Sequence, residues 1–139
     1  VLPGQVEIDG VLQSHSLRRN EILQRIHLPP MPADTRSTYV KFRVRGSWDF
    51  AIAAAAVRLS FEGDVCSQAR IVMGGVATHP YRAIEAEAML QGQRITEELA
   101  AEAAAKAVEG ARPFPTNAYK VDVVRTLVKR SIIKLASAP

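Results

Sequence analysis

Two apolar segments separated by a short turn signal constrain the fold of this chain most strongly. The first covers residues 49–61 and the second covers residues 65–73, with the tripeptide Glu-Gly-Asp between them. Gly63 can adopt the positive φ that tight hairpin turns require. The run "AIAAAAV" fits a helix or a strand, but the alternation that follows in "VRLSF" favours a long strand. We therefore predict an antiparallel hairpin whose alanines leave room for a helix to lie close.

Two further strands are expected upstream of the hairpin. Residues 39–45 alternate cleanly, and this pattern separates two faces: Val40, Phe42 and Val44 on one, and Tyr39, Lys41, Arg43 and Arg45 on the other. Residues 21–28 alternate less regularly but also fit a strand, which ends at three prolines in a stiff connector at 29–34. Residues 1–17 show weak periodicity and are interpreted as a loop or an edge extension.

Helices are expected in the second half of the chain. A segment of helical periodicity at 81–90 follows a proline and ends before a glycine. Thr96 is the expected N-cap of a helix at 97–109, whose first turn holds two acids. Thr116 or Asn117 is expected to cap a third helix, which carries one apolar stripe and most of its cations away from that stripe.

The order of these elements predicts an α+β fold, because strands come first and helices second. In such a fold a helical layer covers one face of a small antiparallel sheet. The length of 139 residues fits a single domain. We assign residues 1–19 to an irregular lead-in, residues 20–75 mainly to strands and residues 80–136 mainly to helices.

The composition limits the possible functions of the chain but does not identify one. The net charge of +4 and the isoelectric point near 9.6 permit an anionic partner. The single cysteine, Cys66, excludes an internal disulfide. The longest apolar run, residues 50–57, is far shorter than the ~20 residues of a membrane span. No secretory signal is visible in the first residues. We expect a cytoplasmic protein that does not bind a membrane.

The sequence contains no recognisable catalytic or metal-binding motif. Its three histidines are scattered, and it has no glycine-rich nucleotide loop or nucleophile elbow. The pair Gly74-Gly75 is expected to serve close packing or a bend at the end of a strand. Glu85 and Glu87 are two residues apart on a helix and point in different directions. We expect them on a solvated or ion-paired helix surface and not in a paired-carboxylate site.

The strand at 39–45 carries the one cluster that stands above background. One face presents three cations beside Tyr39, and Trp48 and Asp49 follow closely. Lys41 and Arg45 lie ~13 Å apart on an extended chain, so a single small anion cannot reach both. From the residues alone, three interpretations stay open. The face is an exposed amphipathic strand, a nucleic-acid patch, or one wall of a site for an extended anionic and aromatic ligand.

Four segments then occur in a fixed order: "NEILQRIHLP", "TYVKFRVRGSWDFAIAAAAVRL", "ARIVMGGVATHPYRAIEAEAMLQGQ" and "NAYKVDVVRTLVKRSI". Together they resemble the C-terminal domain of the FAD-binding (medium) subunit of molybdenum hydroxylases. This family includes carbon monoxide dehydrogenase and bacterial xanthine dehydrogenases, and the resemblance covers residues 20–135. It implies a three-stranded antiparallel sheet packed against a helical layer, which closes one side of the flavin ring of FAD.

The resemblance also implies roles for individual residues. The segment from Tyr39 to Asp49 falls where the family approaches the flavin ring. Lys41 matches a position that is often lysine, and a positive charge there favours the reduced, anionic flavin. Asp49 matches a recurring acid near the ring edge. Tyr39 or Trp48 would shield a ring face by stacking, and Arg45 would hold the loop or neutralise phosphate.

The glycine-rich loops with which the family binds the flavin diphosphate do not occur in this sequence. The resemblance therefore implies the C-terminal domain of a longer subunit, inactive by itself, that shares FAD with an N-terminal FAD-binding domain. It also implies docking to an iron–sulfur subunit and a molybdopterin subunit, from which electrons reach FAD. Two alternatives stay open: a basic module that binds nucleic acid, and an assembly domain that docks proteins without flavin.

Overall fold

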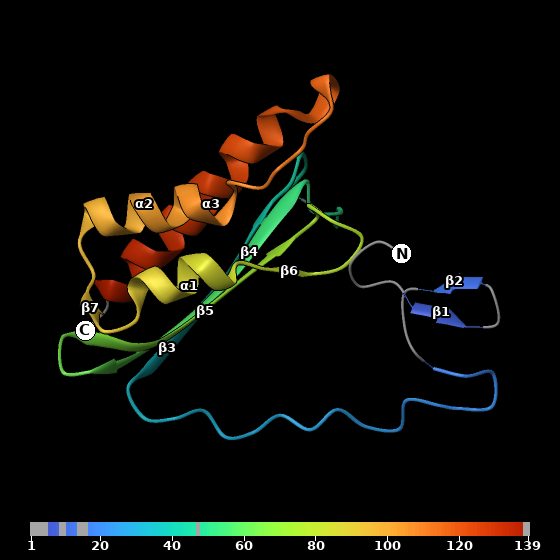
Figure 1. The fold of residues 1–139 in the computed structure, drawn as a ribbon, viewed down its shortest axis with the longest axis horizontal. Coiled ribbons are helices and arrows are strands. Elements are labelled where there is room, and N and C mark those ends of the chain that lie inside the picture. The colour runs from blue at the N-terminus through green and yellow to red at the C-terminus, as the bar shows by residue number, and fades with distance from the viewer. Residues whose placement is uncertain (1–5, 9–10, 14–16, 47, 138–139) are drawn as a thin grey trace.

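The computed structural model describes residues 6–8, 11–13, 17–46 and 48–137. The long strands precede the helices along the chain, and a two-residue strand lies before and after the first helix, as Figure 1 shows. The elements and their bounds are β1 (Val6–Ile8), β2 (Val11–Gln13), β3 (Thr35–Phe42), β4 (Ala53–Glu62), β5 (Val65–Gly74), β6 (Tyr81–Arg82), α1 (Ile84–Leu90), β7 (Gln93–Arg94), α2 (Glu97–Ala107), a 3₁₀ turn (Pro115–Asn117) and α3 (Tyr119–Ala136). The predicted α+β class is confirmed.

The main sheet is antiparallel and has the order β3-β4-β5-β6, with β7 also paired to β5. The predicted three long strands are present as β3, β4 and β5. The sheet nevertheless has five strands, because β6 and β7, each two residues long, pair with separate parts of the free edge of β5. Strands this short carry too little alternation to be recognised in a sequence.

All three helices lie on one side of the sheet (Figure 1). Helix α3 packs against β3 and β4, α1 packs against β5, and α2 packs on α1 and α3. Small side chains allow this close approach: Ala53 and Ala55 on β4 and four alanines of α2 are buried in the core. Larger apolar residues fill the remaining space, among them Val57, Leu59, Ile71, Leu90, Val128 and Ile132.

No helix of the described part of the chain lies over the other face of the sheet, and we call it the open face. Residues alternate between the two faces of a strand, so the neighbours of the core residues point to this side. Strand register places the following residues on it: Ser37, Tyr39 and Lys41 of β3, Ala54, Ala56 and Arg58 of β4, and Gln68, Arg70, Val72 and Gly74 of β5.

A β-bulge in the hairpin keeps the core side chains of β5 on the helix face. Phe61 pairs with Cys66, but the next pair is Ser60 with Gln68, so Ser67 is an extra residue. Without this insertion, Cys66 and Ala69 would point to opposite faces, because three positions separate them. With it, both are buried in the same core.

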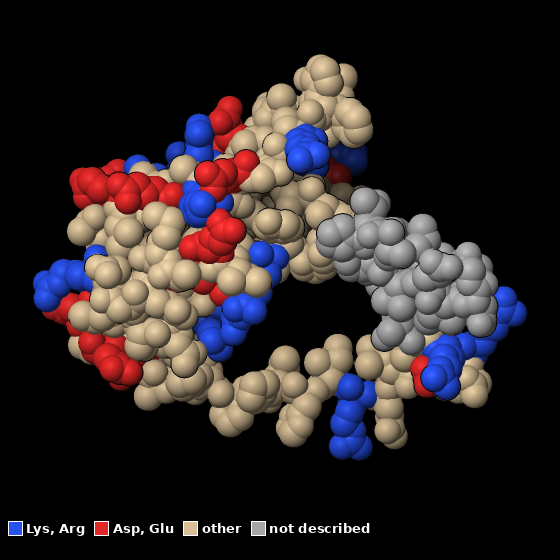
Figure 2. Space-filling view, viewed as in Figure 1, with Lys and Arg blue, Asp and Glu red and all other residues tan. Residues whose placement is uncertain are grey.

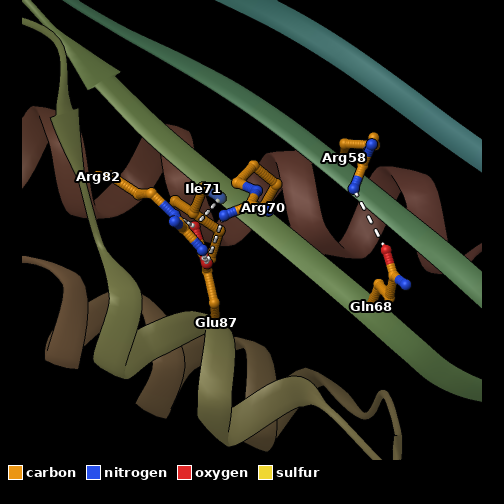
Figure 3. Close-up of polar contacts among 6 residues, drawn as sticks. All are labelled: Arg58, Gln68, Arg70, Ile71, Arg82 and Glu87. Atoms are coloured by element: carbon orange, nitrogen blue, oxygen red, sulfur yellow. Dashed lines mark hydrogen bonds and ion pairs between the residues drawn. The ribbon is translucent and has the colours of Figure 1, made fainter. Parts of the chain in front are cut away.

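The Glu87 side chain binds the edge of β5 between β6 and β7, where neither of these short strands pairs with it. Its Oε1 accepts a hydrogen bond from the Ile71 backbone N–H at 2.9 Å, and Arg82 donates to both carboxylate oxygens at 2.6–3.1 Å (Figure 3). The Ile71 carbonyl accepts from Ala83 N–H at 3.0 Å. The predicted ion pairing of Glu87 is confirmed, but its surface position is wrong. The residue is only 3% exposed, because it supplies an acceptor that the broken strand edge lacks.

Several predicted boundaries are wrong. Residues 21–28 form no strand and are exposed, because no strand among the described residues pairs with their backbone. The lead-in contains the β1–β2 hairpin instead of irregular chain alone. The strand predicted at 39–45 begins earlier, at Thr35, and ends at Phe42.

The helix starts also differ from expectation. Helix α1 begins at Ile84, because β6 takes the two residues before Ala83. Helix α3 begins at Tyr119, after the 3₁₀ turn, and Asn117 caps that turn by accepting from Phe114 N–H at 2.8 Å. Thr96 caps α2 as predicted, with its hydroxyl accepting from Leu99 N–H.

No helix in the described part of the chain is long and apolar enough to cross a bilayer.

Replacing Glu87 with alanine should destabilise the fold strongly. The change leaves the buried Ile71 N–H without its acceptor and removes the carboxylate that Arg82 binds. We expect the free energy of unfolding to fall by ~2–4 kcal/mol in chemical denaturation. Glu102→Ala on the exposed face of α2 is the matched control and should change it by less than ~0.5 kcal/mol. Equal effects of the two substitutions would contradict the assigned role.

The thiol of Cys66 should resist modification in the native protein. Cys66 has no exposed surface, and burial raises the pKa of its thiol. The unfolded thiol has a pKa of about 8.5, and the folded thiol a higher one. Below the unfolded pKa the stability contributed by the neutral buried thiol is fully present, and it is lost as pH rises through the folded pKa. We expect a thiol reagent to react at the unfolding rate and unfolding to become easier above about pH 9. Rapid labelling under native conditions would contradict the burial.

Candidate functional site

The connection between β3 and β4 brings together three of the five predicted site residues. Ile52 N–H donates to the Phe42 carbonyl at 2.9 Å and closes the base of this loop. Lys41, on the open face, donates from Nζ to the Asp49 carbonyl at 2.9 Å. The Asp49 carboxylate lies 3.5 Å from Arg45 Nε. Lys41, Arg45 and Asp49 therefore form one cluster, although Arg45 lies in a bend and not on the predicted strand face.

The charges in this cluster are not equivalent. The Asp49 side chain is 19% exposed, and it also accepts a hydrogen bond from Phe50 N–H at 3.0 Å, so it is held in place and neutralises Arg45. Among the residues that the structure describes, no carboxylate lies within ion-pair distance of Lys41. Its contact with the loop is a carbonyl, which leaves the positive charge available to a ligand.

Tyr39 and Trp48, the other two predicted site residues, are exposed and lie outside the Lys41–Arg45–Asp49 contacts. Tyr39 lies on the open face two residues from Lys41 and is 65% exposed. Trp48 is fully exposed, and its neighbour Phe50 is 94% exposed. Aromatic side chains that gather at one exposed place are typical of a contact surface. The loop therefore offers two apolar rings next to an ordered charge cluster, and the sequence analysis overlooked Phe50.

The sheet beside Lys41 carries small residues. Lys41 pairs with Ala54, which in turn pairs with Gly74, and Ala54 is only 3% exposed. This burial fits the aliphatic stem of Lys41 lying over it. Next in line, Tyr39 pairs with Ala56, which is partly exposed. A ligand can approach the sheet closely here, and the alanine run that the sequence displays is the signal for it.

The glycine pair after β5 supports the loop from the other side. Gly75 has φ = 72°, and a Cβ there would lie 3.0 Å from the Ile52 carbonyl oxygen. Lys120 of α3 donates to the Gly75 carbonyl at 2.7 Å. A Cβ on Gly74 would lie 3.5 Å from the Ala54 Cβ. The predicted role of Gly74-Gly75 in close packing is confirmed, and the pair fixes the start of β4.

A separate cleft of about 370 Å³ lies on the helix side, between the loop after β5, the end of α2 and the start of α3. Its walls include Met73, Tyr81, Val108, Phe114, Lys120 and Val124, and none of the five predicted site residues lines it. Within the described ranges no group of three histidine, cysteine, aspartate or glutamate side chains could hold a metal ion.

Comparison with known proteins identifies the family. Residues 37–135 match the CO dehydrogenase flavoprotein C-terminal domain. The chain belongs to this family. The α subunit of the 6-hydroxypseudooxynicotine dehydrogenase complex of Paenarthrobacter nicotinovorans is 30% identical over 138 residues, which cover 94% of this chain and 46% of that protein. The glyceraldehyde dehydrogenase medium chain of Sulfolobus acidocaldarius is 25% identical, over 85% of this chain and 43% of that protein.

Solved structures agree with this assignment. Quinoline 2-oxidoreductase from Pseudomonas putida superimposes with a TM-score of 0.68 and 32% identity, over 77% of this chain and 38% of that one. Carbon monoxide dehydrogenase from Hydrogenophaga pseudoflava gives 0.69 and 32%, over 76% and 38%. The resemblance and fold class predicted from the sequence are confirmed. The chain spans less than half the length of each of these relatives.

Replacing Gly75 with alanine should weaken the support of the loop. The new Cβ would press on the Ile52 carbonyl, and the backbone would hold alanine at positive φ. We expect a loss of ~1–3 kcal/mol in the free energy of unfolding. Gly46→Ala is the control, because a Cβ there meets nothing within 4 Å and its φ is not positive. The interpretation fails if Gly75→Ala is as stable as Gly46→Ala.

Proposed function

We propose that this chain is the C-terminal domain of the FAD-binding subunit of a molybdenum hydroxylase and that its open face and β3–β4 loop close one side of the flavin site. Family membership supports the subunit, and the Lys41–Asp49–Arg45 cluster is the observation that supports the site. When bound, FAD supplies the redox chemistry of such a subunit. The residues discussed below would hold it and adjust its environment.

The cluster fits a flavin ring in chemical character. Lys41 presents a cation that no carboxylate cancels in the described part of the chain, and a cation beside the ring stabilises the reduced, anionic form. Asp49 holds the loop through Arg45 and its own backbone contacts. Tyr39 and Trp48 are exposed rings, and either can cover a ring face by stacking. Arg45 pairs with Asp49 through Nε, but its side chain is 72% exposed and its other N–H groups can contact a phosphate.

Exposed apolar side chains support a larger assembly. Ile22, Ile26 and Leu28 are 74–90% exposed on an extended segment, and Trp48 and Phe50 are more exposed still. A soluble protein seldom leaves this much apolar surface uncovered. We propose that an N-terminal FAD-binding domain of the same subunit covers part of it. Iron–sulfur and molybdopterin subunits are the further partners, and electrons pass from the iron–sulfur clusters to FAD.

Docking to a protein through opposite charges on α2 and α3 is supported less well. Lys129 of α3 pairs with Glu97 of α2 at 2.9 Å, and Lys106 pairs with Glu85 at 3.0 Å. These lysines and glutamates of the helices therefore neutralise one another within the domain and are less available to a protein partner. The same pairing, together with the Arg125–Asp122 contact, occupies cations that a nucleic acid would need. We propose no nucleic-acid or membrane role, and a cytoplasmic location stays a prediction.

The flavin role predicts an electrochemical effect of Lys41. In the complete complex, Lys41→Met should lower the flavin reduction potential, because the reduced anion loses a nearby cation. A shift of about 30 mV in a two-electron couple corresponds to ~1.4 kcal/mol, and we expect this order of change. Asp49→Asn should lower flavin content or alter the potential by loosening the loop. Spectroelectrochemistry and flavin extraction measure both quantities.

Lys134→Met is the matched control for charge, because this lysine is exposed near the end of α3. It should leave the potential and the flavin content unchanged. If Lys41→Met and Asp49→Asn also leave both unchanged while the complex assembles normally, the open face is not a wall of the flavin site.

A further inference from the structure

Two arginines lie directly opposite each other on the open face. Arg58 of β4 and Arg70 of β5 are partners in the strand register, and their neighbours Val57, Leu59 and Ile71 are buried on the helix face. Side chains of directly opposed residues have Cβ atoms ~5 Å apart, and like charges at that separation destabilise a sheet. An anion that contacts both side chains would offset this repulsion.

The Glu87 carboxylate lies within ion-pair distance of Arg70, but its side-chain hydrogen bonds come from Arg82. Glu87 receives two hydrogen bonds from Arg82 Nε and a third from Arg82 Nη2 at 2.6 Å, whereas Arg70 Nη1 lies 3.7 Å from the same carboxylate (Figure 3). At 3.7 Å the contact is an ion pair without a hydrogen bond. The Arg70 side chain stays 43% exposed, so part of it remains accessible to a partner.

Arg58 has still less compensation. One of its terminal nitrogens donates to Gln68 Oε1 at 3.4 Å, a long and neutral contact that lies farther along β5 from Glu87 (Figure 3). Its Nε is buried and has no acceptor among the described residues. An N–H group that is desolvated without an acceptor costs free energy, and the cost is greater on a charged group. The guanidinium charge of Arg58 therefore has no carboxylate partner within ion-pair distance in the described part of the chain.

The open face around Arg58 and Arg70 has room for an anion from outside the domain. Ala56 and Val72, the next residues along the open face, are small and only partly buried. Figure 2 shows an opening between the helix-bearing part of the molecule and the extended N-terminal segment, with Lys and Arg side chains along its border on the domain side. A polypeptide segment can enter such an opening, where it meets these cations (Figure 2).

We propose that Arg58 and Arg70 together bind a carboxylate of an acidic segment from the remainder of the FAD-binding subunit, so that this face is a docking surface within the subunit. Two planar guanidinium groups suit a carboxylate that accepts from both. The match covers 46% and 43% of the two relatives, so under the proposed function the subunit has a remainder that carries the segment. The proposal rests on the proposed function for the existence of that subunit.

The opposing arginines also lie away from the flavin cluster. Arg58 is four residues along β4 from Ala54, the cross-strand partner of Lys41, which is ~13 Å on an extended strand. The acidic segment and the flavin ring can therefore occupy the open face side by side. We place the carboxylate on protein and make a flavin phosphate an outcome of the test.

Arginine labelling of the full-length FAD-binding subunit, isolated from its partner subunits, tests the proposal. Phenylglyoxal modification is followed by mass spectrometry at Arg70 and at Arg125 of α3. Arg125 is a matched control, because its side chain is 52% exposed and pairs with one carboxylate, Asp122, at 2.7 Å. We expect Arg70 to react about tenfold more slowly than Arg125, because a second, charge-assisted contact holds it. Equal rates would overturn the proposal.

Two further arms identify the source of the anion. Removal of FAD should leave the protection of Arg70 unchanged, and loss of protection would assign the anion to flavin phosphate and overturn the acidic segment. Arg58→Gln should speed the labelling of Arg70 several-fold, because the shared carboxylate loses one of its two donors. Arg125→Gln should not, and an unchanged rate in Arg58→Gln would show that the arginines share no anion.

These outcomes are independent of the flavin measurements. Protection of Arg70 combined with no effect of Lys41→Met would remove the flavin wall and retain the docking surface. An effect of Lys41→Met combined with unprotected Arg70 would retain the flavin wall and remove the docking surface.

Discussion

The packing of α1 and α3 against one face of the β4–β5 hairpin is the interaction on which the other features depend. It requires an unbroken apolar face, and the bulge at Ser67 supplies this by bringing Cys66 and Ala69 to the same side. Because all three helices are used on that side, the opposite face stays open (Figure 1). Polar and small residues can then line it, and a ligand or a partner can reach them.

Two regions of the open face carry charge of different kinds. At the β3–β4 end, Lys41 and Arg45 are organised around Asp49, which supplies a carbonyl to one and a carboxylate to the other. Further along β4, Arg58 and Arg70 oppose each other with little compensation. The first region suits a cofactor with a delocalised negative charge, and the second suits a carboxylate. One face can therefore contact a flavin and a protein segment at once.

The sequence predicts the α+β fold, the hairpin and three helices, because alternation, capping and turn signals are local, whereas the roles of Lys41, Asp49 and Arg45 come from the family resemblance. It could not predict the bulge, which depends on whether Cys66 packs inward. It therefore could not place Arg58 opposite Arg70, since a regular hairpin would pair Arg58 with Ala69. Glu87 was misplaced for a similar reason: its burial arises from a gap between two-residue strands that carry no periodic signal.

The central claim is that the Lys41 end of the open face is one wall of the flavin site. The most direct test is the structure of the complete subunit with FAD bound, in which the distance from Lys41 Nζ to the nearest atom of the flavin ring is measured. The account predicts a separation of about 3–6 Å, from a hydrogen bond to a close charge contact. A separation beyond about 10 Å, where screening removes the influence of the charge, would contradict it.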